Sequence, residues 1–296
     1  MYTPSFNGCW AKVERAKEHR DSLDAYIRET FAVEGNRPRV GMKFDRETEE
    51  HILYVNYMPD LEAFFTRVSV ILGDTVHNLR SGLEHLAFQL ALWNTDGNVR
   101  NERQVQFPIE DTEEAFNARC ALGRGGWLAE VHPDHQAIIE RSQPYHGIDQ
   151  ETMMMGLDFH ALAMLRDLSN MDKHRLLATV MIPPTSLEFV GHMPLLFLLM
   201  GMAQRLFRFE SAIEMKPIEL GAEISRGKFF QSAVGQETDM AGYIRPEITL
   251  PEGRSVLIVL DRIAAVVVKV ISEFEALLQS FLPSDHDEIT SVQTRR

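Results

Sequence analysis

The chain has very few cysteines, few basic residues relative to acidic ones, and no long hydrophobic run. Only Cys9 and Cys120 occur in 296 residues, which excludes a disulfide framework and favours a reducing compartment. Thirty Lys and Arg against 43 Asp and Glu give a net charge of −13. This charge disfavours a general nucleic-acid coat protein or a polybasic membrane binder, so a polyanion would need a local basic patch.

Membrane and secretory segments are also missing from the sequence. The N-terminus lacks the basic region and following apolar region of a secretory signal. The longest near-apolar run, 193–203, is too short to span a bilayer. We therefore expect a cytoplasmic protein without a membrane partner. With 45% hydrophobic and 25% charged residues, the chain can bury a sizeable core.

The hydrophobic spacing changes between helical and strand periods along the chain. Spacings of three and four predict long helices at 7–32, 61–93, 151–175 and 254–282, and short ones at about 111–118 and 134–141. Alternation predicts a β-hairpin at 38–58 with a polar turn at 45–50. Short β-like runs predict further strands at 177–182, 187–190, 218–225 and 247–250.

These elements predict an α+β fold, mainly an α-helical bundle with an antiparallel β segment packed on it. The bundle is expected from 7–175, including the hairpin, and from 254–282, with a β-rich insertion at about 176–250. We expect one domain over 1–283 and a disordered polar tail at 284–296. The run 193–203 fits a buried strand or a buried helix equally well.

The predicted helix 61–93 has a polar stripe opposite its apolar one. The apolar stripe, which predicts the core face, is Leu72, Val76, Leu79, Leu83, Leu86 and Leu90. The polar stripe is Asp74, Asn78, Ser81 and His85, with His77 and Glu84 beside it. Large apolar residues bracket the polar stripe at Val70, Phe88 and Leu92. Because a merely solvated face would lack such residues, we expect a second helix or subunit there, and hence a homodimer.

Arg80 and His85 on this helix are separated by four residues. This Arg-x4-His pattern resembles the signature of the HEPN superfamily, whose helical domains dimerise and include many metal-independent endoribonucleases. The resemblance implies that Arg80 and His85 are catalytic and meet their counterparts across a dimer. It also implies that Ser81, the polar residue after the arginine, supports them. The expected activity is RNA cleavage of the toxin or phage-defence kind, without a cofactor.

The chemistry of this pair suits RNA cleavage, which needs a deprotonated 2′-hydroxyl and a stabilised phosphate charge. Histidine titrates near neutral pH, and arginine can bind a phosphate through two hydrogen bonds. On an ideal helix, however, Arg80 and His85 lie about 140° apart. The two side chains would therefore need a bend or a dimer axis to act on one phosphate.

Two longer stretches also resemble a group of uncharacterised bacterial proteins. They are 77–85, His-Asn-Leu-Arg-Ser-Gly-Leu-Glu-His, and 168–175, Leu-Ser-Asn-Met-Asp-Lys-His-Arg. The resemblance implies a shared layout over most of the chain, and no activity comes with it.

A second polar cluster closes the predicted helix 151–175. Its members are Asn170, Asp172, Lys173, His174 and Arg175. Basic residues in a last turn favour the helix dipole, and Asn or Asp can bond the local backbone, so a purely local role is one interpretation. The other is a network between the two helices, with Asp74 bound to Lys173 or Arg175 and Glu84 bound to His174.

Three classes of function remain open. The first is a HEPN-like endoribonuclease, and the second is a non-catalytic homodimeric binding or scaffold protein. The third is a metal-dependent helical-bundle hydrolase. Its candidate ligands are Asp74, His77, His85, His160, Asp167 and His174. No His-Glu-x-x-His or cysteine cluster supports a metal site, so we predict none.

Overall fold

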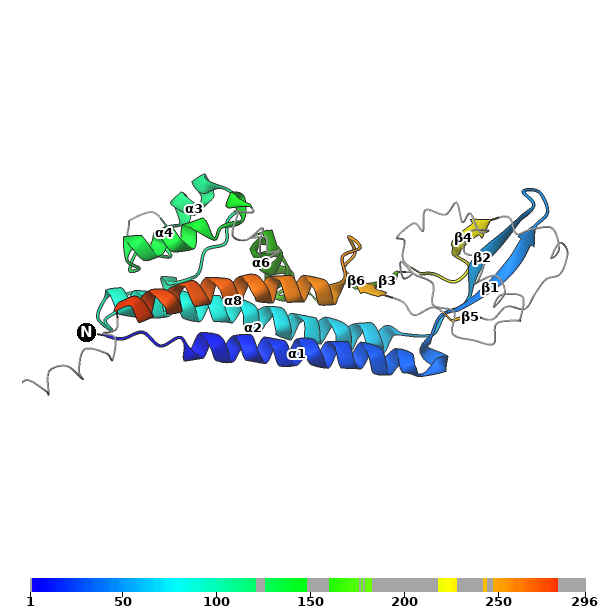
Figure 1. The fold of residues 1–296 in the computed structure, drawn as a ribbon, viewed down its shortest axis with the longest axis horizontal. Coiled ribbons are helices and arrows are strands. Elements are labelled where there is room, and N and C mark those ends of the chain that lie inside the picture. The colour runs from blue at the N-terminus through cyan, green and yellow to red at the C-terminus, as the bar shows by residue number, and fades with distance from the viewer. Residues whose placement is uncertain are drawn as a thin grey trace, which may run out of the picture. The chain divides into compact units, whose positions relative to one another are not determined.

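The computed structural model describes residues 2–120, 126–147, 160–175, 177, 179–182, 218–227, 242–243 and 247–281. The fold is α+β and mainly helical, as predicted (Figure 1). Its α-helices are α1 Asn7–Ala32, α2 Glu62–Asn94, α3 Glu113–Cys120, α4 Pro133–Arg141, α6 His160–Asp172 and α8 Val256–Phe281. Three short 3-10 helices are η1 Glu34–Asn36, η2 Glu102–Gln104 and η3 Pro144–His146.

The strands form two antiparallel sheets. They are β1 Arg39–Asp45, β2 Glu50–Tyr57, β3 Val180–Ile182, β4 Glu223–Gly227, β5 Gly242–Tyr243 and β6 Glu247–Thr249. One sheet has the order β4-β2-β1-β5, and β3 pairs with β6 in the other. The predicted hairpin 38–58 is therefore confirmed as β1 and β2, and β4 and β5 extend it on either side.

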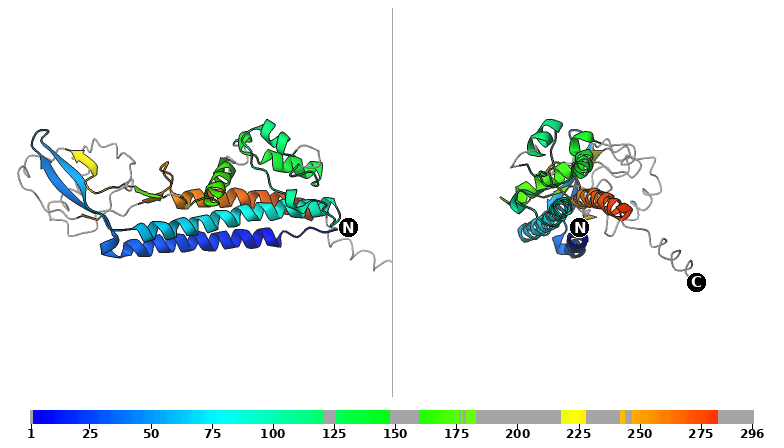
Figure 2. Two further views of the ribbon diagram at one scale, coloured as in Figure 1. Left: turned by 180° about the vertical axis from the view of Figure 1, so that it is seen from behind. Right: turned by 90° about the vertical axis from the view of Figure 1, so that its left-hand side faces the viewer.

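The chain divides into two compact units. The first comprises 1–20, 72–175 and 259–296, and the second comprises 21–71 and 176–258. In the first unit, α1, α2 and α8 run side by side (Figure 2). The expectation of a single domain over 1–283 stays a prediction.

The core of the first unit forms where α2 and α8 bury their apolar stripes. The predicted stripe of α2 is confirmed, because all six of its leucine and valine side chains are at most 1% exposed. On α8, Val267, Val270 and Phe274 are equally buried, and Val266 and Ile271 bury a second face. Burial of each such side chain contributes about 1.5–3 kcal/mol to the free energy of folding. This packing fixes which faces of α2 remain for polar residues.

Most predicted boundaries agree with the structure to within one or two residues. Helix α3 starts at Glu113 rather than 111, where the Thr112 hydroxyl accepts a hydrogen bond from the Ala115 N–H. Of the predicted strands, β3, β4 and β6 are found, whereas the two-residue β5 was not predicted. The predictions for 151–159, 187–190, 193–203 and 284–296 lie outside the described residues.

Candidate functional site

Helix α2 contacts its neighbours closely at two glycines. A Cβ at Gly82 would meet the Cys9 carbonyl of α1 at 3.6 Å. A Cβ at Gly73 would collide with the carboxylate of Asp172 at the end of α6. These contacts place α1 and α6 on two different sides of α2. Asp172, from the second polar cluster, therefore does reach the predicted polar helix.

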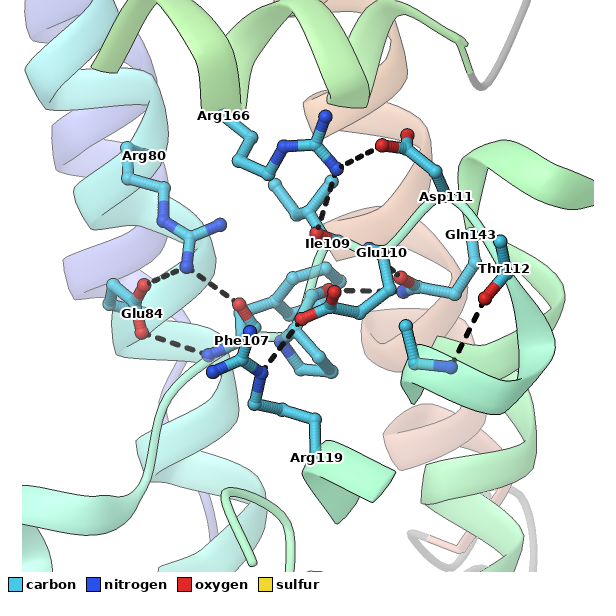
Figure 3. A network of polar contacts seen from close by, with 12 residues as sticks. Arg80, Glu84, Phe107, Ile109, Glu110, Asp111, Thr112, Arg119, Gln143 and Arg166 are labelled. Atoms are coloured by element: carbon cyan, nitrogen blue, oxygen red, sulfur yellow. Dashed lines mark hydrogen bonds and ion pairs between the residues drawn. The ribbon is translucent and has the colours of Figure 1, made fainter. Parts of the chain in front are cut away.

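Arg80 lies on the same side of α2 as Gly73 and is bound on both sides. Its Nη2 donates to the Phe107 carbonyl at 2.7 Å and pairs with Glu84 Oε1 at 2.5 Å (Figure 3). Glu84 Oε2 in turn accepts the Phe107 N–H at 2.9 Å. The two side chains together bond both backbone groups of one residue, as a neighbouring β-strand would. The Arg80 side chain is only 15% exposed.

The segment after Phe107 is held in the same way by residues from other elements. Gln143 accepts the Glu110 N–H at 2.9 Å and donates to the Pro108 carbonyl at 3.0 Å. Arg166 of α6 donates to the Ile109 carbonyl at 3.4 Å. We call Arg80, Glu84, Gln143 and Arg166 the backbone clamp, because they bond the main chain of 107–110. The clamp allows Phe107 and Ile109 to be buried outside any sheet.

Charges around the backbone clamp are paired as well. Arg166 forms ion pairs with Asp111 at 2.9 Å and Asp167 at 2.8 Å. Arg119 pairs with Glu110 at 2.9 Å, and its guanidinium also stacks on Trp127. The close-up shows these groups converging on the 107–112 segment from α2, α6 and α3 (Figure 3). The charged side chains around Arg80 are therefore paired, while its own Nη1 is buried without a hydrogen-bond partner in the described residues.

His85 lies on a different side of α2, away from the backbone clamp. It is exposed, and a Cβ at Gly8 of α1 would lie 2.9 Å from its Nδ1 atom. Within the described residues it has no hydrogen bond or ion pair. Arg80 and His85, predicted to act together, are thus not brought together within one chain.

The rest of the predicted polar stripe is only lightly bonded. The Ser81 hydroxyl lies 3.5 Å from His77 Nε2, and the Asn78 amide donates to the Asp74 carbonyl at 2.8 Å. Asp74, His77 and His85 are exposed, whereas Asn78 is buried. This side of α2 is therefore partly exposed, with Asn78 buried in it and the His85 ring lying beside Gly8 of α1.

The second predicted cluster is mostly exposed. Asn170, Lys173, His174 and Arg175 face solvent, and Arg175 contacts the Met171 sulfur at 3.6 Å. No described residue pair joins Asp74 to Lys173 or Arg175, and Glu84 binds Arg80 rather than His174. Asp172 of this cluster lies close to Gly73 of α2.

Metal and thiol chemistry find little support in the described ranges. There, no three His, Cys, Asp or Glu side chains lie close enough to share a metal ion, so the candidate ligands do not converge. Burial raises the pKa of the Cys9 and Cys120 thiols to about 12, so neither supplies a thiolate near neutral pH. None of the helices described is long and apolar enough to cross a membrane.

Among the participants in the network that sequence reasoning missed are Phe107, Gln143 and Arg166. The run Phe107-Pro108-Ile109 is a short apolar island in a polar, irregular region, which is the one local signal of a buried segment. Gln143 gives no periodic signal because it follows the end of α4, although its side chain is fully buried. Their partners are 23 to 57 residues apart in sequence, beyond the reach of any local pattern.

The comparisons with known proteins assign no relative to the chain. No family model, no curated protein and no solved structure matches it. The function therefore has to be argued from the bonded side of α2, which holds Arg80, and the open side, which holds His85.

Proposed function

We propose that this chain is a non-catalytic protein that self-associates into a homodimer and serves as a binding or scaffold protein. The observation that carries the proposal is the role of Arg80. Its Nη2 is shared between Glu84 and the Phe107 carbonyl, and its side chain is largely buried. An arginine that holds a scissile phosphate has to offer its donors to the substrate. Arg80 instead commits its Nη2 to Glu84 and to the chain's own backbone, and its Nη1 is buried, without a hydrogen-bond partner in the described residues.

The open side of α2 supports self-association. It carries exposed Asp74 and His85, with half-buried Ser81 between them and half-buried Phe88 beyond. Asp74 and His85 are equally distant from a midpoint between positions 79 and 80. An antiparallel two-fold pairing of α2 whose axis passes this midpoint sets the Asp74 carboxylate of each copy beside the His85 imidazole of the other, where an imidazole N–H can donate to the carboxylate. The partner that fits this face is therefore a second copy of the chain.

Cysteine cross-linking tests this pairing directly. In the antiparallel arrangement the two Ser81 positions lie about 4.5 Å apart along the helix axis, within reach of a disulfide. Ser81→Cys should form a disulfide-linked dimer under mild oxidation, and Glu18→Cys on exposed α1 should not. The native thiols are buried and give no background.

Each outcome of this experiment decides something different. A linked Ser81→Cys dimer supports the α2 pairing. A dimer in light scattering that does not link through Ser81→Cys overturns the α2 pairing and leaves self-association standing. A monomer at micromolar concentration overturns the homodimer. The free thiols also support a reducing compartment, so we propose that the protein acts in the cytoplasm.

A HEPN-like, metal-independent endoribonuclease is the second candidate, and the open position of His85 favours it. An exposed imidazole with no partner in the described residues could exchange protons with the attacking or leaving oxygen of RNA. Both His85 side chains lie on the proposed dimer face. RNA incubated with wild type and with His85→Ala, both with EDTA, tests this candidate. We expect no cleavage by either protein, and cleavage by wild type alone would establish the ribonuclease instead.

A further inference from the structure

Helix α4 buries very few of its side chains in the first unit. It has nine residues, of which only His135 and Ile139 are buried. The remaining residues are exposed or partly exposed. A histidine therefore supplies one of the two buried anchors that hold this helix.

His135 lies among aromatic rings of α2 and α8. Its ring centre is 4.7 Å from that of Trp93 and 6.0 Å from that of Phe274. The side chain is 8% exposed, and its Nδ1 atom is buried without a hydrogen-bond partner in the described residues. Such an environment accommodates a neutral imidazole and disfavours an imidazolium, because no acceptor takes the added proton.

A second histidine begins the same helix. His132 is the N-cap of α4, and its Nδ1 accepts the Asp134 N–H at 3.2 Å. The Asp134 carboxylate lies 3.6 Å from the same atom. His132 and Asp134 are therefore the ionisable neighbours of His135 on its own helix.

We propose that His135 makes the docking of α4 acid-sensitive, so that its protonation releases α4 and uncovers Trp93 and Phe274. The device is local, because the titrating group belongs to one short helix. The long helices keep their own apolar contacts when α4 leaves. Acid would thus expose an aromatic surface without unfolding the unit.

The direction of the pH effect follows from the charges around His135. Burial lowers its pKa first, the nearby His132 lowers it further, and Asp134 acts in the opposite direction. Since the pKa in the folded state is below the ordinary value of about 6.5, the docked state holds fewer protons than the released one. The stabilisation of docked α4 by neutral His135 is therefore complete above the ordinary pKa of about 6.5, and it is lost as the pH falls through the lower folded-state pKa.

Other groups on α4 do not reproduce this effect. At its C-terminal end Glu140 accepts hydrogen bonds from Tyr145 and His146. Burial raises the pKa of Glu140, but these bonds outweigh it and leave the pKa lowered. The contact of His146 with Glu140, at 2.6 Å, holds this end of the helix in place. From α2 and α8, Trp93 and Phe274 present uncharged rings to His135. His146 therefore provides a matched control.

Hydrogen exchange of the full chain, resolved by peptide, tests the proposal. After correction for the intrinsic rate, exchange in 133–141 should rise about tenfold or more between pH 7.5 and pH 5, while 263–274 of α8 should not change. His135→Phe should abolish most of the rise, and His146→Gln should leave it. His135→Leu serves as a second replacement if the phenylalanine fits poorly.

The outcomes that overturn the proposal are distinct from a failure to fold. A wild-type α4 whose corrected exchange is independent of pH overturns it without any variant. So does an unchanged rise in His135→Phe or His135→Leu, because the titrating group would then lie elsewhere. Parallel loss of protection in α8 would mean global acid unfolding and would equally overturn it.

Discussion

Helix α2 has two polar sides about 100° apart, and they differ in how their polar side chains are bonded. The closed side, Gly73, Arg80 and Glu84, is packed against α6 and bonded to the 107–110 segment. The open side, Asp74, Ser81 and His85, has few bonds within the described residues. Arg80 and His85 are thus separated between a structural side and a free side. A spacing shared with a catalytic family does not by itself place two side chains at one site.

The largest effect should come from breaking the backbone clamp on the closed side. Arg80→Met leaves the partly buried Glu84 carboxylate and the Phe107 carbonyl without their partner, so the free energy of unfolding should fall by about 3–5 kcal/mol. Urea unfolding measures this loss. Arg15→Met removes an exposed ion pair with Glu18 on α1 and should cost less than about 1 kcal/mol. Equal losses in the two variants would contradict a structural role for Arg80.

Gln143→Ala should have the next largest effect. The side chain is fully buried and bonds the Glu110 N–H and the Pro108 carbonyl. Removing it leaves buried backbone groups unpaired, at a cost of about 2–3 kcal/mol in urea unfolding. Asn117→Ala on the exposed side of α3 is the control and should change stability by less than about 0.5 kcal/mol. Stability unaffected by Gln143→Ala would argue that the 107–110 segment needs no clamp.

Gly73→Ala should have a smaller but measurable effect. The new methyl group would collide with the Asp172 carboxylate, so the Asp172 side chain or the end of α6 must shift, at about 1–3 kcal/mol. Gly35→Ala is a suitable control, because nothing lies within 4 Å of its added Cβ. Thermal unfolding should show a lower Tm for Gly73→Ala alone. A Tm equal to that of wild type would mean that the Asp172 carboxylate turns aside at no cost and does not hold α6 against this side.

The smallest effect on stability is expected from the open side. His85→Ala removes an exposed ring that has no hydrogen bond in the described residues, so unfolding should change by no more than about 0.5 kcal/mol. The same substitution should weaken the homodimer, measured by sedimentation at several concentrations. A large loss of monomer stability would show that the open side is structural too.

The sequence predicts the elements well where the signal is local. The leucine stripe of α2 and the alternation in β1 and β2 record burial at a fixed period, so bounds such as Glu62–Asn94 follow to within one residue. The backbone clamp has no such period. Glu84 meets Phe107 and Gln143 meets Glu110 only after the chain has folded back, and the extended segment between them carries no repeating pattern.

For the polar residues of α2, the sequence predicts the side of the helix on which each lies but not what covers that side. A helical wheel correctly separates Arg80 from His85, and it correctly sets Leu83 in the core. It cannot say which polar side is covered, because that depends on α6 and on Phe107. A pair of Glu84 with His174 was for this reason one of two interpretations left open by the sequence, whereas Glu84 binds Arg80 one turn away.

A pair of double-mutant cycles tests the division of α2 most directly. Urea unfolding of Arg80→Met, Glu84→Gln, His85→Ala and the two double variants with Arg80→Met gives two coupling energies. We predict about 1–3 kcal/mol between Arg80 and Glu84 and a value near zero between Arg80 and His85. Coupling of Arg80 to His85 as strong as its coupling to Glu84 would contradict the account, because the two residues would then act together across a dimer.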